Sequence, residues 1–398
     1  MVSVNEATEI ILKNIVKPRV ESVSLNQAAG RVLAEKIVAD RDFPPFNRVA
    51  MDGIAIVFNT FLKGQRQFSI QDIQAAGEPA KTLKDLTACI EIMTGAVLPE
   101  GTDTIIRYED VEIKDKTAGI TINDVVKGQN IHSQGQDAKQ QDVLLEPHIL
   151  LSAAEIALLA SVGKSMVDVF VFPKIAIVAS GDELVDVQDT PALHQIRRSN
   201  SYALEAAIRL MGGTSTSFHL IDQKEILKNE LQKIVDEHDV VILSGGISKG
   251  KFDFIPEVLE EIGINKLIQQ VSQRPGKPFW FGVGNHKTVF ALPGNPVSTY
   301  MCFYRYIKPW LIKSFGLSDQ PMFAVLAADY KFQPKLTHFL QVRVRNEAGV
   351  LKAYPDAGGG SGDFANLKDV DGFLELPLER SEFKVGDVFS YYPFRSTL

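Results

Sequence analysis

Residues 240–254 have the sequence VVILSGGISKGKFDF, and this stretch decides the fold class of the 398-residue chain. Its apolar, β-branched start at 240–243 predicts a buried strand, which ends in a Ser-Gly-Gly turn. Asp253 then stands where we expect the cap of a helix that begins with FIPEVLEEIG. A strand that passes through small residues into a helix exposes backbone N–H groups, so the stretch predicts a site for an anion such as phosphate.

The same pattern recurs at 174–184, KIAIVASGDEL, and at 287–298, KTVFALPGNPVS. Strands alternate with helical segments from 174 to 312, which predicts a mostly parallel sheet with right-handed crossovers. Ligands bind outside the carboxyl ends of the strands in such sheets. The three strand ends therefore predict one shared crevice.

The remaining sequence divides around this α/β core. Pro44 and Pro45 interrupt a helical pattern, and short β-like runs follow from about residue 50. A second β-like series begins near residue 320. We predict a multidomain α/β plus β protein with a three-layer core and a C-terminal domain resembling a β-barrel. The predicted parts are a helical linker region (1–42 and 139–172), an inserted β-rich domain (43–138), an α/β domain (173–318) and a C-terminal β domain (319–398).

Composition excludes several classes of protein. The net charge of −7 argues against a general binder of nucleic acid or of anionic membranes. Cys89 and Cys302 are far apart and have no CxxC partner, which excludes a disulfide framework and a zinc–cysteine site. The sequence shows no signal-peptide core and no apolar run of membrane-spanning length. We therefore expect a cytoplasmic protein with no membrane or nucleic-acid partner.

Acidic residues follow the predicted strands at Asp182, Glu183, Asp222 and Asp253. Carboxylates beside a phosphate-sized site favour Mg²⁺, which binds hard oxygen ligands together with substrate phosphates. We predict Asp182, Glu183 and Asp253 as metal ligands. For Asp222 and Asp253 the alternative is a helix-capping role, and Asp222 taken alone fits that structural role better.

The loop RPGKP carries Arg274 and Lys277 on a backbone shaped by two prolines and a glycine. Two cations held close together repel each other, and a polyanion would relieve that repulsion, so the loop favours phosphate or a similar oxyanion. Gly294, Asn295 and Ser298 offer further donors at a helix start. The segment GISKG at 246–250 lacks the G-K-[ST] ending of a P-loop, which argues against a Walker-type NTPase.

Nine segments spread along the chain form a recognisable set. They are PPFNRVAMDG (44–53), AGEPA (76–80), IMTGAVLPEGTDTII (92–106), NIHSQGQD (130–137), ASGDEL (179–184), IRRSNSYAL (196–204), LSGGISKGKFDF (243–254), RPGKPFWFG (274–282) and LPGNPVS (292–298). With these segments in this order, the chain resembles the MoeA family of molybdopterin molybdenumtransferases, to which the C-terminal part of gephyrin is related. GGGSGDFANL at 358–367 also resembles the Gly-Ser-Gly segment near the C-terminus of that family.

The resemblance implies an elongated, four-part homodimer whose α/β part is a molybdopterin-binding fold. It implies a transferase that inserts molybdate into adenylylated molybdopterin, with loss of AMP and with help from Mg²⁺. It also implies contact with the molybdopterin adenylyltransferase that precedes it and with apo-molybdoenzymes that follow it. Two other functions stay open: adenylylation of molybdopterin on the same core, and a non-catalytic molybdopterin-binding scaffold. The two extra β domains favour the molybdenum-insertion branch over the first alternative.

The resemblance also implies roles for individual residues. The catalytic residues would be Asp52, Thr94, Asp137 and Asp253, and the first three would reach the crevice of the other subunit from the β-rich domain. For Asp52 and Asp137 the alternative is hydrogen bonding to backbone N–H groups of their own loops. The residues implied to bind substrate are Ser244, Gly245, Gly246, Ser248, Asp222, Arg274, Lys277, Pro293, Gly294, Asn295, Ser298 and Ser361.

Five positions depart from the family pattern. One is Gln136, in a Gly-Gln-Asp segment where the family has Gly-Glu-Asp. Lys249 and Lys251 add positive charge to the central loop beside Asp253. Gln270 stands where the family often has a lysine, which removes one candidate molybdate contact. Arg198 begins an Arg-Ser-Asn segment where the family has Asp-Ser-Asn. These changes leave the predicted fold intact and affect the expected rate and metal preference.

Overall fold

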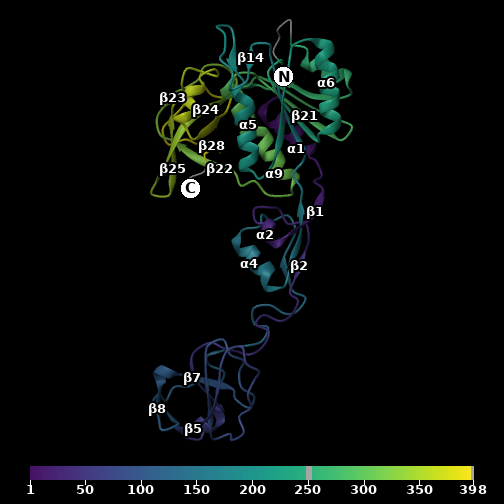
Figure 1. Ribbon diagram of the computed structural model, residues 1–398. Helices are drawn as coiled ribbons and strands as arrows, with labels where there is room; N and C mark the ends of the chain where they lie inside the picture. The colour runs from purple at the N-terminus through teal and green to yellow at the C-terminus, as the bar shows by residue number, and fades with distance from the viewer. Residues whose placement is uncertain (248–252, 396–398) are drawn as a thin grey trace.

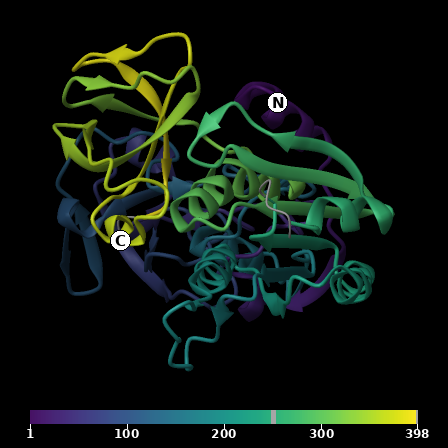
Figure 2. The ribbon, with the colours of Figure 1, turned by 90° about the horizontal axis from the view of Figure 1, so that it is seen from above.

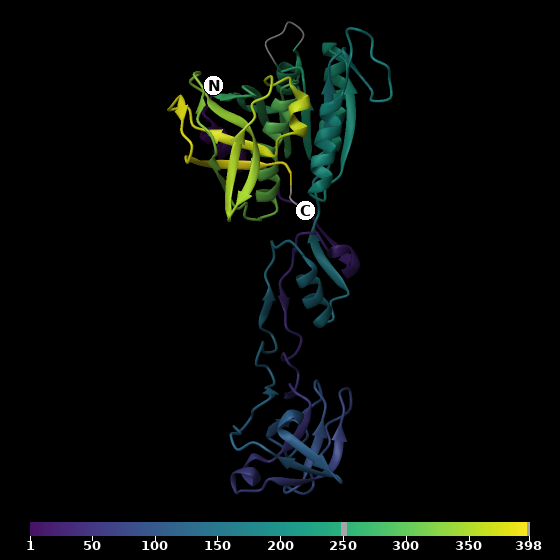
Figure 3. The ribbon, with the colours of Figure 1, turned by 90° about the vertical axis from the view of Figure 1, so that its left-hand side faces the viewer.

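The computed structural model describes residues 1–247 and 253–395; the predicted site residue Ser248 and the departures Lys249 and Lys251 lie outside them. The molecule is elongated (Figures 1 and 3). An α/β unit and a C-terminal barrel lie together at one end, a slender linker follows, and a β-rich domain forms the other end.

The α/β unit is built on a six-stranded sheet in which the first four strands are parallel, the fifth runs opposite to them, and the sixth runs in their direction again. All six residues of β13 and all five of β17 are buried, as expected for strands covered on both faces. In sheet order the strands are β16 (Ser215–Leu220), β13 (Ile175–Ser180), β17 (Val240–Ser244), β21 (Lys287–Leu292), β20 (Pro278–Gly284) and β18 (Asn265–Gln270).

Helices cover the sheet of the α/β unit. Helix α8 continues through a π-helical turn, η2 (Phe303–Ile307), into α9. The covering helices are α5 (Ser199–Leu210), α6 (Lys224–Glu237), α7 (Ile255–Glu261), α8 (Pro296–Cys302) and α9 (Lys308–Ser314). None of the helices in the described part of the chain is long and apolar enough to cross a membrane.

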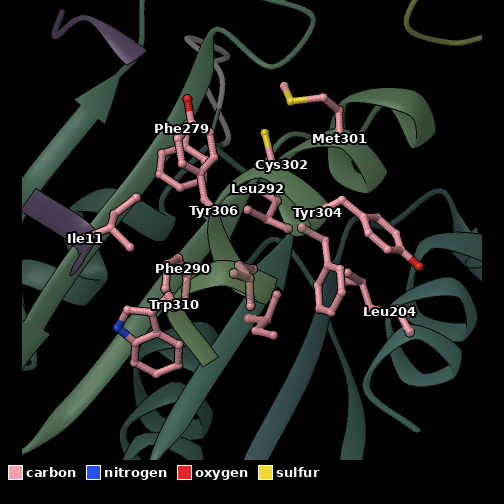
Figure 4. Close-up of a cluster of buried hydrophobic side chains, with 14 of the residues drawn as sticks. Ile11, Leu204, Phe279, Phe290, Leu292, Met301, Cys302, Tyr304, Tyr306 and Trp310 are labelled. Carbon is pink, nitrogen blue, oxygen red and sulfur yellow. The ribbon is translucent and has the colours of Figure 1, made fainter. Parts of the chain in front are cut away.

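The first helix, α1 (Val4–Lys13), also belongs to this core. Ser3 and Glu6 form a capping box at its start, and its buried face includes Ile11. Ile11 lies in the same apolar cluster as Phe290 and Trp310 (Figure 4). The Trp310 indole N–H donates to the Asn14 carbonyl at 2.9 Å. The helix was expected in the linker region, and the structure instead packs it against the α/β unit.

Two chain segments make up the linker. Strand β1 (Val20–Ser24) pairs with β12 (Met166–Phe170), and β2 (Ile37–Val38) pairs with β11 (Val143–Leu145). Helices α2 (Leu25–Ala28) and α4 (Ala153–Ser161) pack on this frame. Ser152 and Glu155 form a capping box at the start of α4.

The distal β-rich domain contains a six-stranded sheet with its own apolar core. Two shorter strands, β3 (Arg48–Val49) and β10 (Ile131–His132), pair beside it, and α3 (Phe58–Leu62) follows β4. In sheet order the strands are β7 (Thr104–Arg107), β4 (Gly53–Ile56), β6 (Cys89–Ile92), β5 (Gln67–Gln74), β9 (Thr117–Ile120) and β8 (Val111–Lys114).

The C-terminal domain is a closed five-stranded barrel, which lies to one side of the α/β unit (Figure 2). Closure follows from the pairing of β24 with both β25 and β26, and it leaves no exposed sheet edge. A short strand of the α/β unit, β19 (Gln273–Arg274), pairs with β24 and ties the two parts together. In ring order the barrel strands are β24 (Thr337–Glu347), β25 (Val350–Pro355), β22 (Met322–Leu326), β28 (Val388–Pro393) and β26 (Gly372–Leu376).

Candidate active site at the carboxyl edge of the α/β sheet

A cavity of about 1050 Å³ lies where the strand ends of the α/β sheet meet the barrel. The barrel contributes the segments 330–341 and 357–361 to its lining. Asp182 and Gln270 are not among its lining residues. The predicted site residues that line the cavity are Glu183, Asp222, Ser244, Gly245, Gly246, Asp253, Arg274, Lys277, Pro293, Gly294, Asn295, Ser298 and Ser361.

The sheet topology explains the position of this cavity. From β13 the chain first adds β16 on one side and then β17 on the other side. The order of strands in the sheet therefore reverses between β13 and β17. Ser180 ends β13 and Ser244 ends β17, and both line the cavity at this switch point. Gly245 has a φ of +100°, and a Cβ there would lie 2.5 Å from the Ser180 carbonyl oxygen. Only glycine fits this turn.

Asn200 joins three elements around the cavity. Its Nδ2 donates to Ser244 Oγ at 2.9 Å, to the Gly294 carbonyl at 2.8 Å and to Thr299 Oγ1 at 3.3 Å. The asparagine thus holds the start of α5 to the end of β17 and to the PGNP loop. The barrel reaches the same loop through Ser361, whose Oγ accepts a bond from Asn295 Nδ2 at 2.8 Å.

The acidic residues gather at the ends of β13 and β16. Asp222 Oδ1 accepts a hydrogen bond from Ser180 Oγ, and the Asp222 backbone N–H donates to Asp182 Oδ1 at 3.1 Å. Burial raises the pKa of Asp222, and the negative charges of Asp182, Glu183 and Asp253 raise it further against the Ser180 bond. Negative charge is therefore concentrated at this edge.

Two capping predictions are wrong. Helix α7 has Phe254 at its cap position, so Asp253 precedes the cap. Helix α6 has Gln223 at its cap position, so Asp222 precedes that cap as well. Both carboxylates line the cavity instead. Among the described residues, no three histidine, cysteine or acidic side chains form a group that could hold a metal ion.

The basic loop is held from both domains. Gln273 Nε2 donates to the Gly276 carbonyl at 2.9 Å, and the Arg274 carbonyl accepts from His338 Nδ1 of the barrel at 3.1 Å. Tyr330 O–H donates to the other ring nitrogen of His338 at 3.1 Å. The Phe332 ring stacks on His338 with centroids 4.0 Å apart. Burial, together with the Arg274 charge, lowers the pKa of His338 to about 4, so the ring is neutral near pH 7.

The predicted catalytic residues of the β-rich domain lie far from this cavity within the chain (Figures 1 and 3). Asp52 Oδ1 accepts the Thr94 backbone N–H at 2.5 Å, and this bond holds the pKa of Asp52 below its usual value. Asp137 Oδ1 lies 2.8 Å from His132 Nε2, and Arg48 Nη2 lies 2.9 Å from His132 Nδ1. Because the guanidinium can only donate, Nδ1 accepts and Nε2–H donates to Asp137.

Comparison with known proteins identifies the family. The chain is 40% identical to the molybdopterin molybdenumtransferase of Synechocystis sp., over 98% of this chain and 100% of that protein. The chain belongs to the molybdopterin molybdenumtransferase family. The molybdopterin molybdenumtransferase of Haemophilus influenzae is 30% identical over the full length of both proteins. The resemblance found in the sequence is thereby confirmed.

Family models and solved structures agree with this assignment. Models match for the MoeA N-terminal region, domains I and II (residues 2–163), a probable molybdopterin binding domain (176–313) and the MoeA C-terminal region, domain IV (324–394). Two crystal structures of a molybdopterin biosynthesis MoeA protein from Pyrococcus horikoshii superpose with TM-scores of 0.85 and 0.84. They share 30% and 28% identity with this chain, and the matches cover 100% and 98% of it and 100% of each structure.

Sequence reasoning missed several residues that shape this member of the family. Ser180 and Asn200 organise the switch point, and His338 with Tyr330 fixes the basic loop. The turn after β13 gave a signal for Ser180, since it precedes a glycine at a strand end. Asn200 and His338 act through contacts 44 and 64 residues away, which no local pattern reveals.

Proposed function

We propose that this chain is a molybdenumtransferase of molybdenum cofactor biosynthesis that inserts molybdate into adenylylated molybdopterin and releases AMP. One observation carries the proposal: a single cavity brings together the carboxylates at the strand ends, the cations of the RPGKP loop and Ser361 of the barrel. Cations and hydrogen-bond donors bind an oxyanion or phosphate, while carboxylates bind a divalent cation. The names of the full-length relatives support the same reaction class.

Arg274 and Lys277 hold an anionic group in this proposal. The planar guanidinium donates two parallel hydrogen bonds, which suits a tetrahedral oxyanion, and the ammonium adds a compact charge. The hydrogen bond from His338 to the Arg274 carbonyl holds the backbone from which this side chain extends. Asn295, bonded to Ser361, brings the barrel to the same anion-binding edge.

In this proposal Mg²⁺ binds at the acidic edge. Asp182, Glu183 and Asp253 would hold it with oxygen ligands, and the raised pKa of Asp222 marks negative charge that a cation would offset. Mg²⁺ is commonly bound by one or two carboxylates together with substrate phosphates, so these residues need not enclose it alone. When bound, the ion supplies polarisation of the phosphoryl oxygens as AMP leaves.

A homodimer with shared active sites accounts for the distal residues. Asp137 keeps its side chain 58% exposed, and it belongs, like Asp52, to the β-rich domain, which lies at the opposite end of the molecule from the α/β unit and the barrel (Figures 1 and 3). Their chemistry reaches the substrate if the β-rich domain of a second copy approaches this cavity. We expect the enzyme to act in the cytoplasm, to receive its substrate from the molybdopterin adenylyltransferase and to deliver its product to apo-molybdoenzymes.

AMP release from adenylylated molybdopterin, with Mg²⁺ and with or without molybdate, tests the reaction. The wild-type chain should release AMP only with molybdate, and Asp253→Asn and Asp137→Asn should each lose that activity. Asp236→Asn, on the exposed side of α6, is the matched control and should keep it. Tight pterin binding by the wild-type chain without any AMP release would contradict the proposal and favour a scaffold protein.

Co-expression of the two inactive variants tests the shared site. A heterodimer would then contain one crevice with intact Asp253 that meets a partner's intact Asp137. Random pairing should restore about a quarter of the wild-type activity, since half of the dimers are mixed and half of their sites are intact. A site built within one subunit would give no restoration.

A further inference from the structure

The start of helix α5 faces the cavity with unused hydrogen-bonding capacity. Residues 196–201 line the cavity, and α5 begins within them at Ser199. Arg198 occupies the cap position without forming a side-chain cap bond, and the first turn contains no acidic residue. The first N–H groups of a helix have no intrahelical acceptor, and they carry its partial positive charge.

Ser201 supplies independent evidence for a ligand at this helix start. It lies in the first turn of α5, lines the cavity and is 2% exposed. Its hydroxyl has no hydrogen-bond partner among residues 1–247 and 253–395. A buried hydroxyl without a partner is destabilising, and such a group in a binding cavity calls for an explanation. A ligand atom in the cavity would give it one.

Arg198 adds a cation to the same helix start. One of its terminal nitrogens donates to Asp186 Oδ2, and Tyr202 O–H donates to Asp186 Oδ1 at 3.0 Å. Its Nε is buried and has no partner within the described part of the chain. A positive side chain at the N-terminus of a helix opposes the helix dipole and is unfavourable for the folded chain alone. An anion bound at this helix start would interact favourably with both the Arg198 charge and the helix dipole.

We propose that the start of α5 is a second anion subsite of the cavity, at which Arg198, Ser201 and the first N–H groups of the helix bind a phosphoryl group. This subsite lies on a different element from the RPGKP loop. Two separate anion subsites suit a substrate that carries a phosphoryl group and reacts with an oxyanion. Naming the phosphoryl group as part of the substrate rests on the proposed function.

The alternative is that Arg198 only anchors the loop that contains Asp186. Arg198→Asn separates these roles, because asparagine is a preferred helix cap and leaves no cation. A subsite predicts that this variant binds AMP about tenfold more weakly, the value of one charge-assisted hydrogen bond, while its melting temperature stays equal or rises. A purely structural anchor predicts a lower melting temperature and unchanged AMP affinity, which would overturn the proposal.

Isothermal titration of the full-length protein with AMP measures this affinity without turnover. Ser201→Ala should have a melting temperature equal to or above that of the wild type and bind AMP several-fold more weakly, so it provides a test even if Arg198→Asn folds poorly. Arg209→Asn, exposed in the last turn of the same helix, is the matched control and should bind like the wild type. Equal AMP affinity for wild type and Ser201→Ala would contradict the subsite.

Titration with inorganic phosphate identifies the group that is recognised. Weakening of both phosphate and AMP by Arg198→Asn assigns the contact to the phosphoryl group, whereas weakening of AMP alone assigns it to the nucleoside and overturns the proposal. The reaction and the subsite fail separately. If the wild-type protein shows no molybdate-dependent AMP release, the proposed function is refuted, but phosphate binding that depends on Arg198 would still support the subsite.

Discussion

Replacement of His338 by glutamine should change how the stability of the protein depends on pH. Burial and the nearby Arg274 charge lower the pKa of His338 from 6.5 to about 4, against the hydrogen bond to the Arg274 carbonyl. The folded ring therefore stays neutral where the unfolded ring is protonated. The stability that His338 contributes is complete above pH 6.5 and is lost as the pH falls from 6.5 to about 4.

The size of this effect follows from the two pKa values. One pKa unit corresponds to about 1.4 kcal/mol, so a fall from 6.5 to about 4 corresponds to about 3 kcal/mol of unfolding free energy. His338→Gln removes the titrating group. The unfolding free energy of the wild type, minus that of the variant, should therefore fall by about 3 kcal/mol between pH 7 and pH 4.

Urea unfolding of both proteins across this pH range measures the difference, and NMR titration of the His338 ring measures its pKa directly. His194→Gln is the matched control, since this exposed histidine contacts solvent in the folded and the unfolded chain. A His338 ring that titrates with a midpoint near 6.5, or a difference that is flat with pH, would refute the reasoning. The interaction between the barrel and the RPGKP loop would then be much weaker than the geometry indicates.

Two further variants test the electrostatics of the fold. Asp222→Asn should raise the melting temperature at pH 7 and abolish AMP release. Because the pKa of Asp222 is raised in the folded state, its ionised form destabilises the fold at any pH above that folded pKa. A lower melting temperature for the variant would show that the hydrogen bond from Ser180 dominates. Arg305→Leu should cost about 3 kcal/mol, because it leaves the Glu375 carboxylate of the barrel, which is only 17% exposed, without its 2.8 Å cationic partner. Calorimetry measures both effects, and a stability loss below about 1 kcal/mol would show that water reaches Glu375.

The core of the fold was predictable where the residue pattern of one segment shows how that segment is buried. Strands β13 and β17 are continuous apolar runs, and such runs are typical of parallel strands that helices cover on both faces. Strands β18 and β20 were not predicted as part of this sheet. β18 is only partly apolar, and β20 begins in the same RPGKP segment that was interpreted as a loop.

The placement of α1 depended on information that is absent from its own sequence. Apolar spacing predicts a helix with one buried face, but it does not say which surface covers that face. In the structure, the covering surface is formed by residues near 290 and 310, almost three hundred positions along the chain. The predicted linker region therefore contained a helix of the α/β unit.

The candidate site likewise contains residues that were predictable from local sequence and residues that were not. The strand-end acids and the RPGKP cations were predictable, because small-residue turns after buried strands and a rigid cationic loop are local features. Arg198 appeared in the sequence only as a departure from a family pattern. The structure gives this departure a physical setting, since it places the arginine at the uncapped start of a helix that faces the cavity, three residues before an unpartnered buried serine. If this position were only structural, an acidic or amide cap would stabilise the helix better, so the arginine is best explained by an anion that binds there.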